Sequence, residues 1–211
     1  MTFDAGEIFD KWRTGAAAVA VLSAVILAAP TSADAGDTAF LSLQQPTPAP
    51  AGFHGLCARY DWVCAPSART TLDAATARKL ARDVNRKVNR QIHEIADQAQ
   101  YGKEEYWSLP SRRGGDCEDF ALLKKKLLVE SGIASQSLLI ATVLDRKLNS
   151  HAVLVFRTTA GDVVLDNLTN RILSWEKTGY TFLKLQNPKA LQNWGAVLAG
   201  GIISGKPTAS F

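Results

Sequence analysis

The chain has 211 residues, of which 46% are hydrophobic and 21% are charged, and it contains 15 glycines and 8 prolines. This composition can support a folded core, and it excludes a collagen-like, low-complexity or wholly disordered chain. The formal net charge of +4 is too small to indicate a nucleic-acid partner. Three cysteines are too few for a disulfide-built miniprotein or an all-cysteine zinc site. The length indicates one domain with appended segments.

Residues 1–35 have the parts of a secretory signal peptide. An uncharged apolar run at 15–29 follows Lys11 and Arg13, and the small-residue sequence ADA follows it at 33–35. The run is shorter than the ~20 residues that a membrane-spanning helix needs, and its flanks match a basic start and an A-x-A cleavage site. We therefore expect cleavage after Ala35 and export from the cytoplasm. An uncleaved membrane anchor and a buried helix of the domain are the alternatives.

The rest of the chain is expected to form one domain between two less ordered segments. Residues 36–52 include the run QQPTPAP, whose prolines favour extended backbone without a core, and they are predicted to be a linker. Residues 53–194 are predicted to be the folded domain. The glycine-rich residues 195–211 are predicted to be a flexible C-terminal tail.

Cys57 and Cys64 stand close together in the sequence CARYDWVC. Their spacing does not match a common zinc site, and no histidine follows at the spacing of a zinc ligand. In an exported chain we expect the two to form a disulfide, with two free buried thiols as the alternative. Such a disulfide leaves Cys117 as the odd cysteine, which is a sign of reactivity in an exported protein.

Two helices are predicted in the first part of the domain. The first covers 70–99, where apolar residues recur at helical spacing, with Thr70, Thr71 or Asp73 as its cap. The second begins at the sequence GGDCED at 114–119, and its lysines at 124–126 are expected to face mostly outward. The basic face of the first helix indicates either a solvated surface or an anionic partner such as a membrane. That face carries Arg78, Lys79, Arg82, Arg86, Lys87 and Arg90.

The second part of the domain is predicted to be β-structure. Segments at 138–143, 151–156 and 163–166 are rich in β-branched residues, and the sequence TTAG at 158–161 supplies a turn. Further short strands are expected at 172–175 and 182–185. Helices followed by antiparallel strands indicate an α+β fold, with N-terminal helices packed on an antiparallel sheet.

Cys117 is expected in the first turn of the second helix, after two glycines and the capping residue Asp116. The unpaired N–H groups and the dipole of a helix start lower the pKa of a thiol there. The neighbouring carboxylates of Asp116, Glu118 and Asp119 oppose that effect, because they disfavour another negative charge. A further positive charge is therefore required, from either a protonated histidine or a metal ion.

His151 and Asp166 are expected to meet across a hairpin. His151 opens one predicted strand and Asp166 ends the next, and these two ends of an antiparallel hairpin lie side by side. Each of Cys117, His151 and Asp166 alone has an ordinary structural interpretation, as a small buried residue, a strand-edge histidine and a strand terminator. Together they are the residue types of a nucleophile, a general base and an orienting carboxylate, which favours a catalytic triad.

The sequences GDCEDFAL, HAVL and VLDN resemble those of bacterial transglutaminase-like cysteine peptidases, and the resemblance covers about residues 53–186. It implies a papain/transglutaminase-like fold and a triad made of Cys117, His151 and Asp166. It also implies a periplasmic endopeptidase that releases a surface adhesin, and an inner-membrane receptor that holds the enzyme inactive. Acyl transfer to an amine or glutamine deamidation on the same triad, and an inactive binding domain, are the alternative functions.

The same resemblance implies a calcium ion bound by acidic residues that flank the cysteine. Here these are Asp116 and Glu118, with Asp119 as a further candidate. Carboxylate oxygens are the ligands that calcium prefers, and the ion would offset the crowding of negative charge around Cys117. The alternative is that the three carboxylates only favour the helix start and bind no metal.

Overall fold

The computed structural model describes residues 39–68 and 72–204. The predicted signal peptide, the candidate caps Thr70 and Thr71, and the end of the predicted tail lie outside the described residues. Within the described ranges, no helix combines the length and apolar character needed to cross a membrane.

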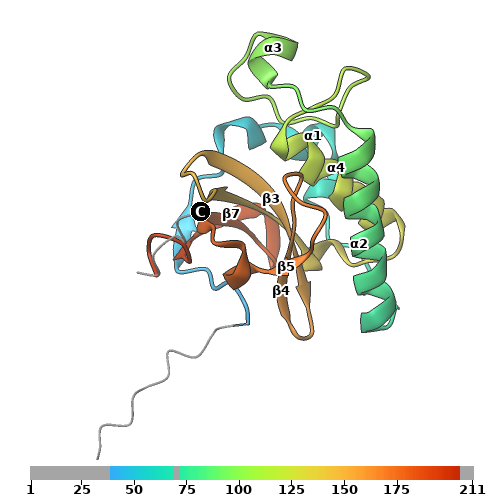
Figure 1. Cartoon of the computed structure of the whole chain (residues 1–211), viewed down its shortest axis with the longest axis vertical. Coiled ribbons are helices and arrows are strands. Elements are labelled where there is room, and N and C mark those ends of the chain that lie inside the picture. The colour runs from blue at the N-terminus through green and yellow to red at the C-terminus, as the bar shows by residue number, and fades with distance from the viewer. Residues whose placement is uncertain (1–38, 69–71, 205–211) are drawn as a thin grey trace, which may run out of the picture. The chain divides into compact units, whose positions relative to one another are not determined.

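The domain is built on one seven-stranded antiparallel sheet, which confirms the α+β fold (Figure 1). The strand order is β1-β7-β6-β2-β3-β4-β5. The five strands expected from the sequence are all present, and β1 and β7 were not expected. The strands are β1 (Gln45–Thr47), β2 (Leu138–Leu144), β3 (Ser150–Thr158), β4 (Gly161–Leu165), β5 (Leu173–Ser174), β6 (Thr181–Asn187) and β7 (Ala190–Ala199).

Among the residues that the structure describes, four α-helices precede the main strands, and two of them, α2 and α4, are long enough to pack against the sheet. The helices are α1 (Leu56–Arg59), α2 (Ala74–Gln91), α3 (Asp97–Tyr101) and α4 (Cys117–Glu130). The carboxylate of Asp73 caps α2 by accepting a hydrogen bond from Thr76 N at 2.9 Å. Apolar residues on the inner faces of α2 and α4 form one core with one face of the sheet.

The first predicted helix is shorter than expected, because the chain leaves helical geometry at Ile92. After α2, the backbone of His93 and Ile95 pairs with Gly115, with Gly115 N donating to His93 O at 3.0 Å and Ile95 N donating to Gly115 O at 3.1 Å. Gly114 allows this approach, since its φ is +126° and a Cβ there would lie 2.0 Å from His93 O. The break creates the separate helix α3.

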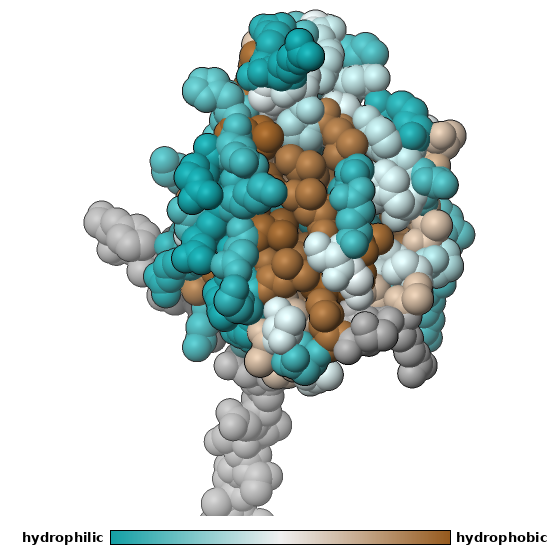
Figure 2. All heavy atoms as spheres, turned by 90° about the vertical axis from the view of Figure 1, so that its right-hand side faces the viewer, coloured by the Kyte–Doolittle hydropathy of each residue, from teal (hydrophilic) through white to brown (hydrophobic). Residues whose placement is uncertain are grey.

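The basic residues of α2 are exposed, as expected (Figure 2). Figure 2 faces the side of the molecule on which α2 lies and shows hydrophilic residues gathered beside an apolar band. Asp83 on the same helix forms ion pairs with Lys79 and Arg86, both at 2.8 Å. Such exposed pairs contribute little to stability.

Two lysines of α4 do not face outward as the sequence predicted. Lys124 and Lys125 have only 1% and 0% of their surface exposed. The reason is that α4 is covered on several sides, by α2, by β3 and by the short turn of helix at Asp61–Val63. Lys125 Nζ donates to Gln186 Oε1 at 3.0 Å, which ties α4 to strand β6.

The structure also differs from the predicted boundaries of the linker and the tail. Within the predicted linker, β1 pairs with β7, and Leu41 is buried on the second face of the sheet. Asp162 Oδ2 accepts a hydrogen bond from Leu41 N at 2.9 Å. Strand β7 continues through Ala199, five positions into the predicted tail. Both segments are ordered because each supplies the other with a neighbouring strand and apolar contacts.

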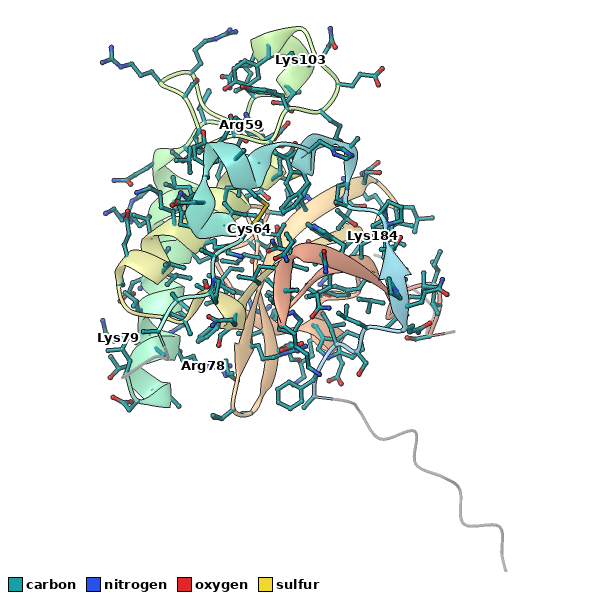
Figure 3. All side chains as sticks on the ribbon, turned by 180° about the vertical axis from the view of Figure 1, so that it is seen from behind. Arg59, Cys64, Arg78, Lys79, Lys103 and Lys184 are labelled. Carbon is teal, nitrogen blue, oxygen red and sulfur yellow. A yellow bond between two sulfur atoms is a disulfide. The ribbon has the colours of Figure 1, made fainter. Side chains whose placement is uncertain are left out.

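Cys57 and Cys64 form the expected disulfide (Figure 3). The loop that it closes lies against the chain that leads to α4. Arg59 Nη2 donates to Trp107 O at 2.7 Å, and Tyr60 Oη accepts a hydrogen bond from Leu109 N at 3.3 Å. The disulfide-closed loop therefore holds the segment around Trp107 and Leu109, which precedes Cys117 in the sequence.

Candidate active site

Cys117 is the first residue of α4, and two glycines place it there. A Cβ on Gly115 would lie 2.5 Å from the carboxylate of Asp119, so only glycine lets the backbone pass this closely. Asp116 occupies the capping position of α4, but its side chain makes no capping hydrogen bond. The Asp116 side chain therefore does not satisfy the N–H groups of the first turn of α4, in which Cys117 lies.

The thiol of Cys117 lies against the start of β3. Ala152 N donates a hydrogen bond to Cys117 Sγ at 3.3 Å. Ala152 directly follows His151, so the helix-borne sulfur and the strand-borne imidazole are brought to one place. Cys117 is partly buried, and His151 is 8% exposed.

His151 and Asp166 are in direct contact, as the hairpin geometry predicted. His151 Nε2 lies 2.9 Å from Asp166 Oδ1. The strands align Leu154 with Leu165, so that Asp166, directly after β4, lies near the start of β3, where His151 is the second residue. With Nε2 engaged by the carboxylate, Nδ1 is the ring nitrogen left to exchange a proton with a thiol.

Asp166 is held by more contacts than the sequence indicated. Its Oδ1 also accepts from Leu168 N at 3.0 Å, and its Oδ2 accepts from Tyr180 Oη at 2.5 Å. Its backbone oxygen accepts from Asn89 Nδ2 at 2.8 Å. Burial works toward a higher pKa for Asp166, but the hydrogen bonds from His151 and Tyr180 outweigh it and hold that pKa below its usual value.

Three carboxylates next to the thiol form a compact cluster. Oxygen atoms of Asp97, Asp116 and Glu118 all lie within 4.8 Å of one another. Asp97 N donates to Asp116 Oδ2 at 3.3 Å, which joins α3 to the start of α4. Oδ1 of Asp97 and Oδ1 of Asp116 are buried and have no hydrogen-bond partner among the described residues. Buried carboxylate oxygens without partners fit a site for a cation.

Asp119, the third candidate ligand from the sequence, is not one of the three residues whose oxygens lie within 4.8 Å of one another, although its Oδ2 is also buried without a hydrogen-bond partner among the described residues. It is fully buried, and its Oδ1 accepts a hydrogen bond from Ser108 N at 2.8 Å. Its carboxylate also packs against Gly115. In this arrangement Asp119 holds the segment around Ser108 against α4, and Asp97 takes the place in the cluster that the sequence suggested for Asp119.

Residues 43–201 match the model of a protein family described as bacterial transglutaminase-like cysteine proteinases. The chain belongs to this family. It is therefore a cysteine peptidase, and its substrate is a protein. No curated protein sequence matches the chain significantly.

Solved structures of Legionella pneumophila LapG are similar to this cysteine peptidase. Calcium-bound LapG is 26% identical, with a TM-score of 0.50 over 59% of this chain and 71% of the LapG chain. EGTA-treated LapG is 28% identical, with a TM-score of 0.46 over 53% of this chain and 63% of the LapG chain. The match to the calcium-bound form agrees with the transglutaminase-like fold that the sequence implied.

Burial and acidic neighbours together set the electrostatics around the thiol of this peptidase. Burial and the Glu118 carboxylate raise the pKa of the Cys117 thiol well above its ordinary value, and Cys117 Sγ donates to Glu118 Oε2 at 3.2 Å. Burial and the nearby Asp116 raise the pKa of Glu118 to about 9, and burial raises the pKa of Asp97 to about 6. All three shifts come from negative charge confined away from water, so a cation in the cluster would lower each of them.

Sequence reasoning missed Asp97, Tyr180 and Asn89. Asp97 lies 19 positions before Asp116 and joins the cluster only because of the pairing between His93 and Gly115. Tyr180 belongs to a distant segment with no motif. Asn89 could have been recognised, because it and the fully buried Asn85 are polar amides close to the apolar stripe of α2. Both donate to the backbone of the loop after Asp166, at Thr169 O.

Proposed function

We propose that this peptidase is an endopeptidase in which Cys117 is the nucleophile, His151 the general base and Asp166 the orienting carboxylate. One arrangement carries the proposal. Cys117 Sγ accepts from the backbone of Ala152, next to His151, and the imidazole of His151 is fixed by Asp166. A helix-borne thiol beside a carboxylate-oriented imidazole is the arrangement that nucleophilic acyl transfer needs.

In this mechanism His151 moves protons at its Nδ1 atom. It accepts the proton of the Cys117 thiol, and the thiolate attacks the carbonyl carbon of a peptide bond. The N–H groups in the first turn of α4 stabilise the oxyanion that forms. The imidazolium returns the proton to the leaving amine, and a thioester remains on Cys117. Water activated by His151 then hydrolyses the thioester and regenerates the thiol.

Asp97, Asp116 and Glu118 are the residues that would hold calcium. All three offer carboxylate oxygens, two of which are buried without partners, and the similar LapG structure is described as calcium-bound. When bound, the ion supplies positive charge that lowers the free energy of ionised carboxylates and of the adjacent thiolate. Within the chain, Asp97 links this cluster to α3, and Glu118 lies in hydrogen-bond contact with the thiol itself.

We propose that the enzyme acts in the periplasm after export by residues 1–35. The basic flank, the apolar run and the ADA sequence support this, and a disulfide is typical of oxidising compartments. The mature chain is expected to begin near residue 36. Amino-terminal sequencing of the cellular fractions tests export, and an intact amino terminus in a dominant soluble cytoplasmic pool would contradict it.

The proposed substrate is an exported or surface protein, for which an adhesin is the leading candidate, and an inner-membrane receptor is the proposed regulator. Both come from the family resemblance in the sequence. The test of the reaction is to incubate the mature enzyme with exported proteins and map new amino termini. Wild type should create termini that the Cys117→Ala variant does not. Release of ammonia without new amino termini would indicate deamidation or acyl transfer instead of hydrolysis.

A further inference from the structure

One tyrosine contacts both His151 and Asp166. Tyr180 Oη donates to Asp166 Oδ2 at 2.5 Å, and the Tyr180 ring meets the His151 ring edge to face, with centroids 5.9 Å apart and planes at 87°. The side chain is 8% exposed. It stands directly before β6, whose neighbour β2 pairs with β3, so the sheet brings it beside the hairpin that carries His151.

The backbone of Tyr180 is fixed on both sides. Tyr180 N donates to Thr178 Oγ1 at 3.1 Å, and Arg146 Nε donates to Thr178 O at 2.7 Å. Gly200 packs against the Tyr180 carbonyl so closely that a Cβ there would lie 2.5 Å from its oxygen. A hydroxyl on such a constrained residue has little freedom to move away from Asp166.

The two oxygens of Asp166 have separate partners. Oδ1 accepts from His151 and from Leu168 N, whereas Oδ2 accepts from Tyr180 and from no other described residue. Partners on Oδ1 alone would restrain the carboxylate at one oxygen and leave the buried Oδ2 without a donor. The Tyr180 hydroxyl fixes the plane of the carboxylate and prevents a buried oxygen from being left unpaired.

We propose that Tyr180 is a positioning residue for the peptidase reaction, which acts through Asp166 to hold the imidazole of His151 in its productive orientation. This inference rests on the proposed triad and adds a fourth residue to it. Tyr180 does not touch the reacting atoms. It gives the orienting carboxylate a fixed direction that the hairpin alone does not provide.

Tyr180→Phe tests the proposal because it keeps the ring and removes only the hydroxyl. A lost hydrogen bond to a buried charge predicts a fall in kcat of about tenfold with KM changed less than about twofold. The acidic limb of the pH profile of kcat/KM should also move to higher pH, because Asp166 then binds a proton more readily. Other titratable groups on the elements around this pair include Cys117, Glu118, Lys124, Asp145, Arg146 and Arg171.

A double-mutant cycle separates positioning from a general structural effect. Tyr180→Phe should cost about tenfold in kcat in the wild-type background and almost nothing in the Asp166→Asn background. Wild-type kcat and an unshifted pH profile in Tyr180→Phe would overturn the inference, as would an equal loss in both backgrounds. Failure of the proposed function has a different signature, since Cys117→Ala or Asp166→Asn would then keep wild-type activity whatever Tyr180→Phe does.

Discussion

At the scale of single residues, the orientation of His151 depends on one buried carboxylate. Its Nε2 contacts Asp166 Oδ1, and the two side chains are 7% and 3% exposed. If the carboxylate is removed, water has little access to His151 Nε2 and cannot easily take its place as a hydrogen-bond partner. The ring orientation, and with it the position of Nδ1, therefore follows from Asp166.

Asp166→Asn should lower kcat by at least about 100-fold, because the amide neither fixes the correct tautomer nor stabilises the imidazolium. Cys117→Ala should abolish turnover, and His151→Ala should cost nearly as much, since the two act as a unit. Steady-state rates of peptide release measure all three. An Asp166→Asn enzyme with wild-type kcat would remove Asp166 from the mechanism.

The structure also distinguishes Asp97, which the sequence did not indicate as a ligand, from Asp119, which it did. Each has one oxygen that accepts from a backbone N–H, of Tyr106 or Ser108, and one buried oxygen without a partner among the described residues. Only Asp97 has an oxygen within 4.8 Å of those of both Asp116 and Glu118. Asp97→Asn should weaken calcium binding at least about tenfold, because it removes one charged ligand. Asp119→Asn is the matched control and should bind calcium as wild type does, since the amide oxygen can still accept from Ser108 N.

Titration calorimetry on metal-stripped protein measures both affinities. A bound ion that favours the folded state should also raise the melting temperature, so calcium should stabilise wild type and Asp119→Asn more than Asp97→Asn. Equal affinities for the two variants would contradict the assignment of Asp97, and no binding by wild type would leave the carboxylates without a metal role.

At the scale of elements, α4 combines the candidate nucleophile with two buried lysines. Burial lowers the pKa of Lys124 and of Lys125 to about 7. Lysine in an unfolded chain titrates near pH 10.4, so between about pH 7 and pH 10 the unfolded chain binds more protons than the folded one. The contribution of these lysines to stability therefore rises with pH over that window.

Lys125→Met should stabilise the protein at pH 7 by on the order of 1 kcal/mol, because no ammonium then has to be buried. The gain should shrink toward pH 9, because the free-energy cost of deprotonating the wild-type lysine on folding falls as the pH approaches the pKa of lysine in the unfolded chain. Urea unfolding of both proteins at the two pH values measures the difference, in which contributions of all other groups cancel. Lys126→Met is the control, since Lys126 lies nearer the surface in an ion pair with Glu130. A Lys125→Met gain that does not depend on pH would contradict this account.

At the scale of the whole molecule, the sequence predicts contacts between residues of one helix start or one hairpin. It does not predict contacts that depend on the order of strands in the sheet. The placement of the proposed triad could be predicted because Cys117 starts a helix and because His151 and Asp166 belong to one hairpin. Tyr180 could not, since its position follows from the order β6-β2-β3, which no local pattern encodes.

The same limit explains the acidic cluster and the ends of the domain. Asp97 approaches Asp116 through the backbone pairing of His93 with Gly115, which depends on tertiary packing. Strand β1 is short and proline-containing, and it is recognisable only beside β7. The buried lysines at 124 and 125 were missed because three successive lysines ordinarily mark an exposed helix face.

The cysteines of the whole chain allow a direct test of the proposal that Cys117 is the nucleophile of this peptidase. The sequence has three cysteines, of which Cys57 and Cys64 are joined, so the unreduced protein presents one free thiol to iodoacetamide. Mapping of the alkylated residue, with parallel measurement of new amino termini, should show cleavage lost in proportion to modification of Cys117. Full cleavage activity with Cys117 completely alkylated would contradict the account.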